Sequence, residues 1–151
     1  NNAGVQDSGR DIDVNLRGTI YCTEKYGIQP NIKAIIMTAS VSAHNGAEFP
    51  EYCASKGGVL AYTKNVALRV AKYGATCNSI SAGGVITELN AHILENKSLW
   101  DQVMAETLIP KWATVEEMAE WTYFLAVVNK SMTAQDVLID NGEIAKANFV
   151  W

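Results

Sequence analysis

The chain has 151 residues, of which 48% are hydrophobic and 19% charged, a composition that suits one domain with a sizeable core and excludes a disordered chain or a coiled coil. The 12 basic and 16 acidic residues are scattered and give a net charge of −4, which excludes the basic surface that nucleic-acid binding requires. No apolar run reaches membrane-spanning length, so we expect a soluble, cytoplasmic protein with no membrane partner and no nucleic-acid partner.

The first predicted elements are a strand and the long helix that follows it. Residues Lys33–Ser40 form an apolar run without polar alternation, which predicts a strand buried on both faces. From Tyr52 to Tyr73 the apolar residues recur at helical spacing. Gly74, just past the last of them, is typical of a helix C-cap.

Two more strands and a further helix follow. Residues Thr76–Ser81 and Asp136–Asp140 predict strands, and the pair Asn141-Gly142 is a turn signal. Between these strands, Thr114-Val-Glu-Glu117 has the spacing of a capping box and predicts the start of a helix. That helix carries an apolar stripe through Met118, Trp121, Leu125 and Val128. Strands alternating with helices predict an α/β fold with a parallel sheet, in one domain or part of one.

Neither a disulfide framework nor a metal site is predicted. The three cysteines, Cys22, Cys53 and Cys77, are irregularly spaced, and we expect all of them to be reduced. His44 and His92 lie far apart, and no carboxylate pair stands beside either at ligand spacing. Because His44 lies between two of the motifs below, we expect it at the mouth of a substrate pocket.

Five short motifs occur in a fixed order along the chain. They are Asn1–Gly4 (NNAG), Asn15–Gly18 (NLRG), Thr38–Ser40, Tyr52–Lys56 (YxxxK) and Ala82–Thr87. Each alone is a weak signal, since Tyr and Lys four residues apart on an exposed helix are common and NNAG could be a polar turn. Their order and spacing make the joint signal strong.

Together these motifs resemble the classical short-chain dehydrogenase/reductase family, which carries NNAG, a helix Asn, a Ser, YxxxK and PGxxxT. The resemblance covers nearly the whole chain, and Asp140-Asn141-Gly142 is similar to the family's VDGG ending. It implies a Rossmann-like, doubly wound parallel sheet with helices on both faces. Residues 1–151 would be part of one such domain, the catalytic and substrate-lid portion. The implied activity is NAD(P)-dependent interconversion of an alcohol and a ketone or aldehyde.

The resemblance assigns catalysis to Tyr52, Lys56, Ser40 and Asn15. Carbonyl reduction needs a proton donor beside the carbonyl oxygen, and alcohol oxidation needs the same group as a base. Tyrosine has a pKa of about 10, which a nearby cation lowers. Lys56 lies one helical turn from Tyr52 on the same face. Ser40, at a strand end, would hold the substrate oxygen. By resemblance, Asn15 orders a water that connects Lys56 to solvent.

The same resemblance implies NAD or NADP as the cofactor. The residues implied to bind it are Asn2, Ala3, Gly4, Tyr52, Lys56, Val85 and Thr87. The first three would bring backbone close to the cofactor ribose, where small residues are needed. Val85 would hold the nicotinamide carboxamide through its main chain, and Thr87 through its hydroxyl group.

The expected partners are a small alcohol or carbonyl substrate and further copies of this chain. Gly57, Gly58 and Ala61 let another helix approach closely, and family members pair this helix across a two-fold axis. A homodimer or homotetramer is therefore expected. The segment Glu88–Trp112 corresponds to the family's substrate lid, and its tryptophans could stack on a substrate or pack on their own core.

The sequence also departs from the family. The amino-terminal half with its TGxxxGxG phosphate loop is missing from this sequence, roughly 80–90 residues at ~30 per βα unit. Eleven positions separate Gly4 from Asn15, about half the family's usual interval. These two gaps favour a longer protein over a short gene product. Ala82 replaces the usual proline of PG, and Ala134 replaces the glycine usual in ITG.

Two alternatives stay open. The extended branch of the superfamily, epimerases and dehydratases, also uses YxxxK, but the 64 residues after Thr87 are too few for its substrate domain. A truncated, non-catalytic dimerisation or binding module is favoured by the missing phosphate loop. The intact set of Tyr52, Lys56, Ser40 and Asn15 favours the enzyme.

Overall fold

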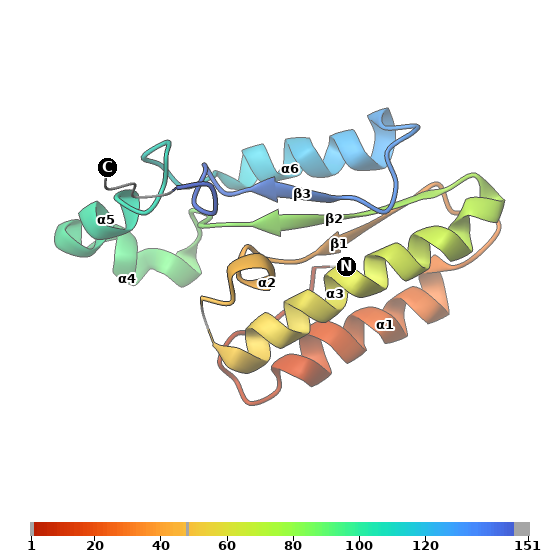
Figure 1. The fold of residues 1–151 in the computed structure, drawn as a ribbon, viewed down its shortest axis with the longest axis horizontal. Helices are drawn as coiled ribbons and strands as arrows, with labels where there is room; N and C mark the ends of the chain where they lie inside the picture. Colours follow the sequence, from red (N-terminus) through yellow and green to blue (C-terminus); the bar gives the residue numbers. More distant parts are fainter. Residues whose placement is uncertain (1, 48, 147–151) are drawn as a thin grey trace, which may run out of the picture.

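The computed structural model describes residues 2–47 and 49–146, and its centre is a three-stranded sheet in the order β1-β2-β3 (Figure 1). The strands are β1 (Ala34–Thr38), β2 (Thr76–Ala82) and β3 (Asp136–Ile139). Both strand pairs are parallel, which confirms the sheet that the alternating pattern predicts. The bounds agree with the predicted strands to within two residues.

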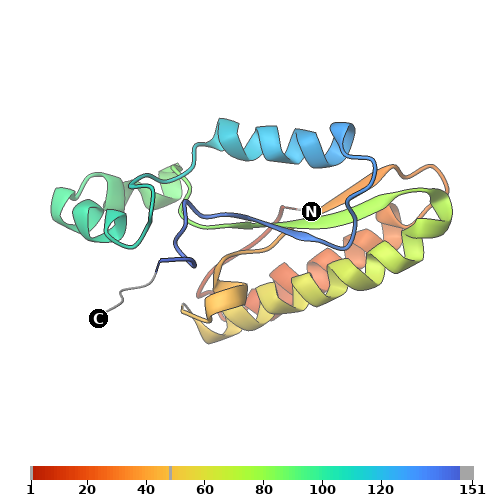
Figure 2. The same cartoon turned by 45° about the horizontal axis from the view of Figure 1, so that its top comes forward.

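Two long helical segments lie side by side on one face of the sheet (Figures 1 and 2). The first is a continuous stretch of wide and regular turns, η1 (Ile12–Arg17), α1 (Gly18–Cys22) and η2 (Thr23–Gly27). The second is α3 (Pro50–Val70), extended by η3 (Ala71–Tyr73). Gly74 follows with a φ of 67°, and its left-handed backbone confirms the predicted C-cap.

The opposite face is covered by α6 (Val115–Tyr123) and its continuation η5 (Phe124–Val128) (Figure 2). Both hydrogen bonds of the predicted capping box are present at Thr114 and Glu117. The apolar stripe predicted on this helix is only partly buried. Leu125 is buried, but Trp121 is 43% and Val128 52% exposed.

Four short helices lie near the carboxyl ends of the strands (Figure 1). They are α2 (Ser42–Asn45), η4 (Glu88–Asn90), α4 (Ala91–Leu94) and α5 (Lys97–Met104). The last three fall in the segment that the family resemblance assigns to the substrate lid. Within the described ranges, no helix combines the length and the hydrophobicity needed to cross a membrane.

The main core lies between α3 and the sheet. Val59 and Val66 of α3 pack in one cluster with Ile35, Met37 and Cys77 of β1 and β2. The opposite side of β1 is only half-buried. The prediction that this strand is buried on both faces is therefore wrong, because β1 lies at the edge of the described sheet and the α6–η5 helix is alone on that side.

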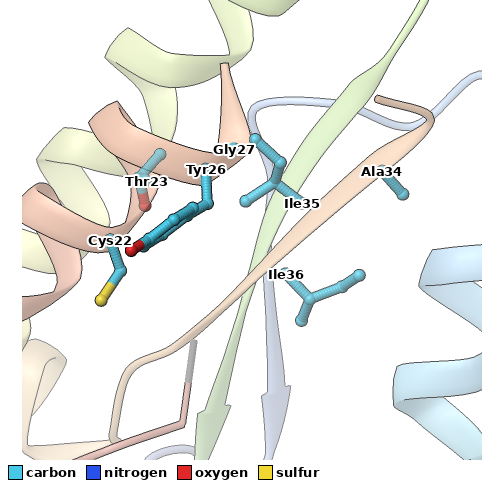
Figure 3. Close-up of a pocket in the computed structure, with 7 residues that line it drawn as sticks. All are labelled: Cys22, Thr23, Tyr26, Gly27, Ala34, Ile35 and Ile36. Atoms are coloured by element: carbon cyan, nitrogen blue, oxygen red, sulfur yellow. The ribbon is translucent and has the colours of Figure 1, made fainter. Parts of the chain in front are cut away.

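A groove of about 320 Å³ runs beside the edge of β1 that faces away from β2 (Figure 3). Its helical wall is formed by Cys22, Thr23, Tyr26 and Gly27, and its other wall is residues 34–36 of the strand. The groove lies along the first half of β1. The candidate site residues described below gather instead at the carboxyl end of that strand.

The two glycines after Lys56 have different surroundings. A Cβ on Gly58 would lie 2.7 Å from Leu16 Cδ2, whereas a Cβ on Gly57 would meet nothing within 4 Å. The close helix contact at Gly58 is therefore made by α3 with η1 of the same chain. The glycine and alanine pattern is thus partly used within the chain, and the pairing of this helix with another copy stays a prediction.

These glycines give a matched pair of variants. Gly57→Ala is expected to raise the free energy of unfolding by up to about 1 kcal/mol, because alanine is the better helix former. Gly58→Ala is expected to be less stable than Gly57→Ala by about 1–3 kcal/mol, because its methyl group overlaps Leu16. Denaturant unfolding of both variants measures the difference. Lower stability of Gly57→Ala would contradict the open surroundings seen here and indicate a second chain packed at that glycine.

Ala134 adopts a left-handed backbone with a φ of 60°, which explains why the family usually has glycine there. We expect Ala134→Gly to raise the free energy of unfolding by about 0.5–1 kcal/mol, since relief of strain exceeds the entropy cost of glycine. Ala71→Gly is the control, because Ala71 has a φ of −52° and should only lose stability. Equal losses in both variants would show that the Ala134 backbone is not strained.

Candidate active site

Tyr52 and Lys56 come together on the first turns of α3. The Lys56 Nζ lies 5.6 Å from the centroid of the Tyr52 ring. Pro50 starts the helix at its first position, where a proline fits without breaking a hydrogen bond. This start places Tyr52 in the first turn and Lys56 one turn further along the same side.

Lys56 is a buried cation. Only 5% of the residue is exposed, and its Nζ donates a hydrogen bond to the Thr38 carbonyl oxygen at 3.0 Å. Burial lowers the pKa of Lys56, because desolvation penalises the charged form. The ammonium group is thus held at the carboxyl end of β1, where open α/β sheets bind their ligands.

Asn15 is buried within the wide turns of η1 and connects three segments. Its Oδ1 accepts from the Val5 amide at 2.7 Å, and its Nδ2 donates to the Val5 carbonyl at 2.8 Å and to Ser55 Oγ at 3.1 Å. The side chain therefore positions the segment after Gly4 against α3. Asn15 therefore has a positioning role, in addition to the water relay that the family resemblance implies.

The segment of the NNAG motif lies over this lysine. A Cβ on Gly4 would stand 3.3 Å from Asn15 Oδ1 and 3.7 Å from Lys56 Nζ, so a side chain there would crowd both groups. Asn2 Oδ1 accepts from Thr38 Oγ1 at 3.1 Å, and Ala3 is exposed. Asn1 lies outside the described residues. The structure therefore brings Gly4 beside the buried ammonium group.

Ser40 follows β1 and is buried. Its Oγ lies 2.7 Å from Ser42 Oγ, so the two hydroxyls share a hydrogen bond. Backbone pairing with β2 continues past the strand end, from Ala39 to Ile80 and from Val41 to Ala82. Ser40 is therefore fixed on both sides by the sheet and lies two residues beyond the carbonyl that binds Lys56.

The loop after β2 carries Val85 and Thr87. The Asn90 side-chain amide donates to the Val85 carbonyl at 2.8 Å and approaches Thr87 Oγ1 at 3.4 Å. An amide NH₂ thus already fits between these two acceptors. A nicotinamide carboxamide carries the same group, so the residues present fit that end of the cofactor.

The predicted lid segment packs against this loop. The Trp112 ring covers Gly84 so closely that a Cβ there would lie 2.0 Å from its Nε1. Trp100 meets Trp112 edge to face, with ring centroids 5.4 Å apart. Hydrogen bonds join Ala113 to Gly84 and Ile86. Of the two possibilities left open for these tryptophans, packing on their own core is the one the structure shows.

Three neighbours of the predicted residues were not foreseen from the sequence. They are Ser42, Ser55 and Asn90, each hydrogen-bonded to a predicted site residue. Ser55 lies inside the YxxxK motif, directly before Lys56, so the sequence could have indicated that it is close to the site. The other two give no local pattern. All three cysteines are free thiols, and in residues 2–47 and 49–146 no group of three potential ligands could hold a metal ion.

A parallel sheet covered by helices on both faces, with a Tyr–Lys pair at the carboxyl end of a strand, defines a Rossmann-like α/β protein. The chain belongs to the short-chain dehydrogenase/reductase family. A family profile described as enoyl-(acyl carrier protein) reductase matches residues 3–143.

Curated relatives agree with this family. The uncharacterized oxidoreductase YxbG of Bacillus subtilis is 34% identical, over 96% of this chain and 61% of its own length. L-rhamnose 1-dehydrogenase (NADP(+)) of Thermoplasma acidophilum is 28% identical, over 85% of this chain and 53% of its own length. The chain therefore spans only half to three-fifths of these relatives. The solved structure of 4-hydroxyisoleucine dehydrogenase complexed with NADH is also similar, with a TM-score of 0.87 and 26% identity. The match covers 97% of this chain and 67% of that one.

Proposed function

We propose that the full-length protein is an NAD(P)-dependent oxidoreductase that interconverts an alcohol and a ketone or aldehyde. Residues 1–151 would be the catalytic and lid portion of a single Rossmann-type domain that works as a homo-oligomer. The observation that carries the proposal is the buried Lys56 ammonium group, 5.6 Å from the Tyr52 ring and beside the small residues of NNAG.

NAD or NADP is the proposed cofactor. The similar structure binds NADH, and the relative from Thermoplasma acidophilum is named for NADP(+). When bound, the nicotinamide supplies or accepts the hydride. Val85 and Thr87 would hold its carboxamide, in place of the Asn90 amide that now occupies their acceptors. Asn2, Ala3 and Gly4 would leave room for the ribose.

Four side chains of this chain have separate roles in the proposed reaction. Tyr52 gives a proton to the carbonyl oxygen during reduction and takes it back during oxidation. The Lys56 ammonium group favours the phenolate form of Tyr52. Ser40 donates a hydrogen bond that holds the substrate oxygen. Asn15 holds the backbone of the Val5 segment against α3.

The test is oxidation of NADH and of NADPH by the full-length protein over a panel of ketones and aldehydes. We expect carbonyl-dependent oxidation of at least one cofactor, with the matching alcohol and oxidised cofactor giving the reverse reaction. Cofactor binding is measured separately by calorimetry. Absence of both binding and turnover would overturn the proposal and favour the non-catalytic binding module.

A further inference from the structure

Helix α2 is attached to the sheet through a polar cluster that is buried on β2 and partly exposed at His44. Cys77 of β2 points into the core beneath α3, and residues at alternate positions of a strand share one face. Ser79 and Ser81 therefore face the same side, and both are buried. Hydroxyl groups in such a row need hydrogen-bond partners, because an unpaired buried polar group destabilises the fold.

His44 and Asp136 supply those partners. His44 Nε2 lies 2.8 Å from Asp136 Oδ2 and 3.2 Å from Ser81 Oγ, and Ser79 Oγ donates to Asp136 Oδ1 at 2.5 Å. Because a carboxylate only accepts, we assign a hydrogen to His44 Nε2. The side chains of His44 and Asp136 are 29% and 16% exposed. The ring faces the sheet, in place of the expected position at a pocket mouth.

This contact lies one helical turn from Ser40. Ser42, the first residue of α2, shares a hydrogen bond with the Ser40 hydroxyl, and the His44 amide donates to the Val41 carbonyl at 2.8 Å. The Val41 amide in turn donates to Ala82 of β2 at 3.0 Å. The segment that carries Ser40 is thus held to the sheet at its start by backbone and at its end by the His44 ring.

We propose that His44 is a positioning residue, which holds α2 on β2 and β3 and thereby fixes the Ser40 hydroxyl for the substrate oxygen. This inference rests on the proposed function. Without the hydrogen bond from His44, Asp136 loses a donor, and the backbone hydrogen bonds of Val41 and His44 remain to hold α2 to the sheet. A displacement of about 1 Å at a residue that orients substrate can lower the rate up to about 100-fold.

The experiment compares four single variants and one double variant of the full-length protein. His44→Phe keeps the ring volume and removes the hydrogen bond, while His44→Gln restores a donor of similar reach. Asn45→Ala is the control on the same helix, because Asn45 Oδ1 accepts from the Ala47 amide at 2.9 Å, within its own loop. Asp136→Ala, alone and combined with His44→Phe, tests the pair by a double-mutant cycle.

For His44→Phe we expect kcat to fall by about tenfold, with the Kd for reduced cofactor unchanged. Hydrogen exchange of residues 39–46 should accelerate. His44→Gln should recover most of the activity, Asn45→Ala should match the wild type, and the double variant should lose no more than the single ones. Exchange in His44→Gln can be measured even where His44→Phe fails to fold.

Three outcomes overturn the inference. They are wild-type kcat in folded His44→Phe, no recovery in His44→Gln, and additive losses in the double variant. If in these cases the wild type still reduces carbonyls and Tyr52→Phe does not, the proposed function stands without this role for His44. If the wild type itself shows no turnover, both proposals fail.

Discussion

Replacing Tyr52 by phenylalanine is expected to abolish carbonyl reduction while cofactor binding is retained. The variant removes only the hydroxyl that would transfer the proton, and general acid–base catalysis contributes about 10²–10⁴ in rate. The ring, the helix and the Lys56 contact keep their places. Steady-state kcat with the best carbonyl of the panel and a calorimetric Kd for NADH or NADPH measure the two effects.

Tyr62→Phe is the matched control on the same helix. The Tyr62 hydroxyl donates to Glu24 Oε1 at 2.8 Å, and burial together with this carboxylate raises the pKa of Tyr62. Its phenol therefore stays protonated and links α3 to η2. Tyr62→Phe should lose a little stability and no turnover. Equal activity of Tyr52→Phe and the wild type would mean that another group is the proton donor.

Lys56→Met is expected to separate activity from stability. Turnover should fall at least about 100-fold, because the cation that favours the Tyr52 phenolate is gone. The free energy of unfolding at neutral pH should rise by about 1–2 kcal/mol, since methionine fills similar space without a buried charge. Loss of the hydrogen bond to the Thr38 carbonyl limits this gain.

The stability difference between Lys56→Met and the wild type should depend on pH. Burial lowers the pKa of Lys56 below its ordinary value of 10.5, so the folded state binds this proton more weakly than the unfolded state. The wild type is therefore destabilised at all pH values below the folded pKa and recovers as the pH rises through it toward 10.5. The stability advantage of Lys56→Met should shrink over that range.

Lys64→Met, at an exposed position of α3, provides the comparison. It should keep full activity and a stability close to that of the wild type. Thermal unfolding of the three proteins between neutral pH and pH 10 distinguishes the cases. An advantage of Lys56→Met that stays constant with pH would indicate that the methionine gains by packing and not by removal of a charge.

The sequence predicted elements well where the signals are local. The Thr114 capping box, the Gly74 C-cap and the three strands depend on residues within a few positions of one another, and all were confirmed. Asn141-Gly142 forms the predicted turn with φ values of 53° and 82°. The place of Lys56 beside Tyr52 follows from helix geometry alone.

Contacts between distant segments were not predictable in this way. Leu16 packs against Gly58, and Asn15 forms hydrogen bonds with Val5 and Ser55. These contacts depend on how η1 and α3 lie next to each other, which the whole fold determines. His44 meets Asp136 across 92 positions of sequence. In each case the residue type was visible, while its partner was fixed only by packing.

The groove beside β1 has a practical consequence for laboratory work. Among the named strands β1 pairs with β2 alone, and the groove beside its other side is lined by Cys22, Tyr26 and residues 34–36 of the strand. Recombinant material limited to these 151 residues would leave the exposed aromatic and aliphatic side chains of this groove uncovered and would therefore tend to self-associate. Kinetic and calorimetric measurements need an expression product in which that side of the strand is covered.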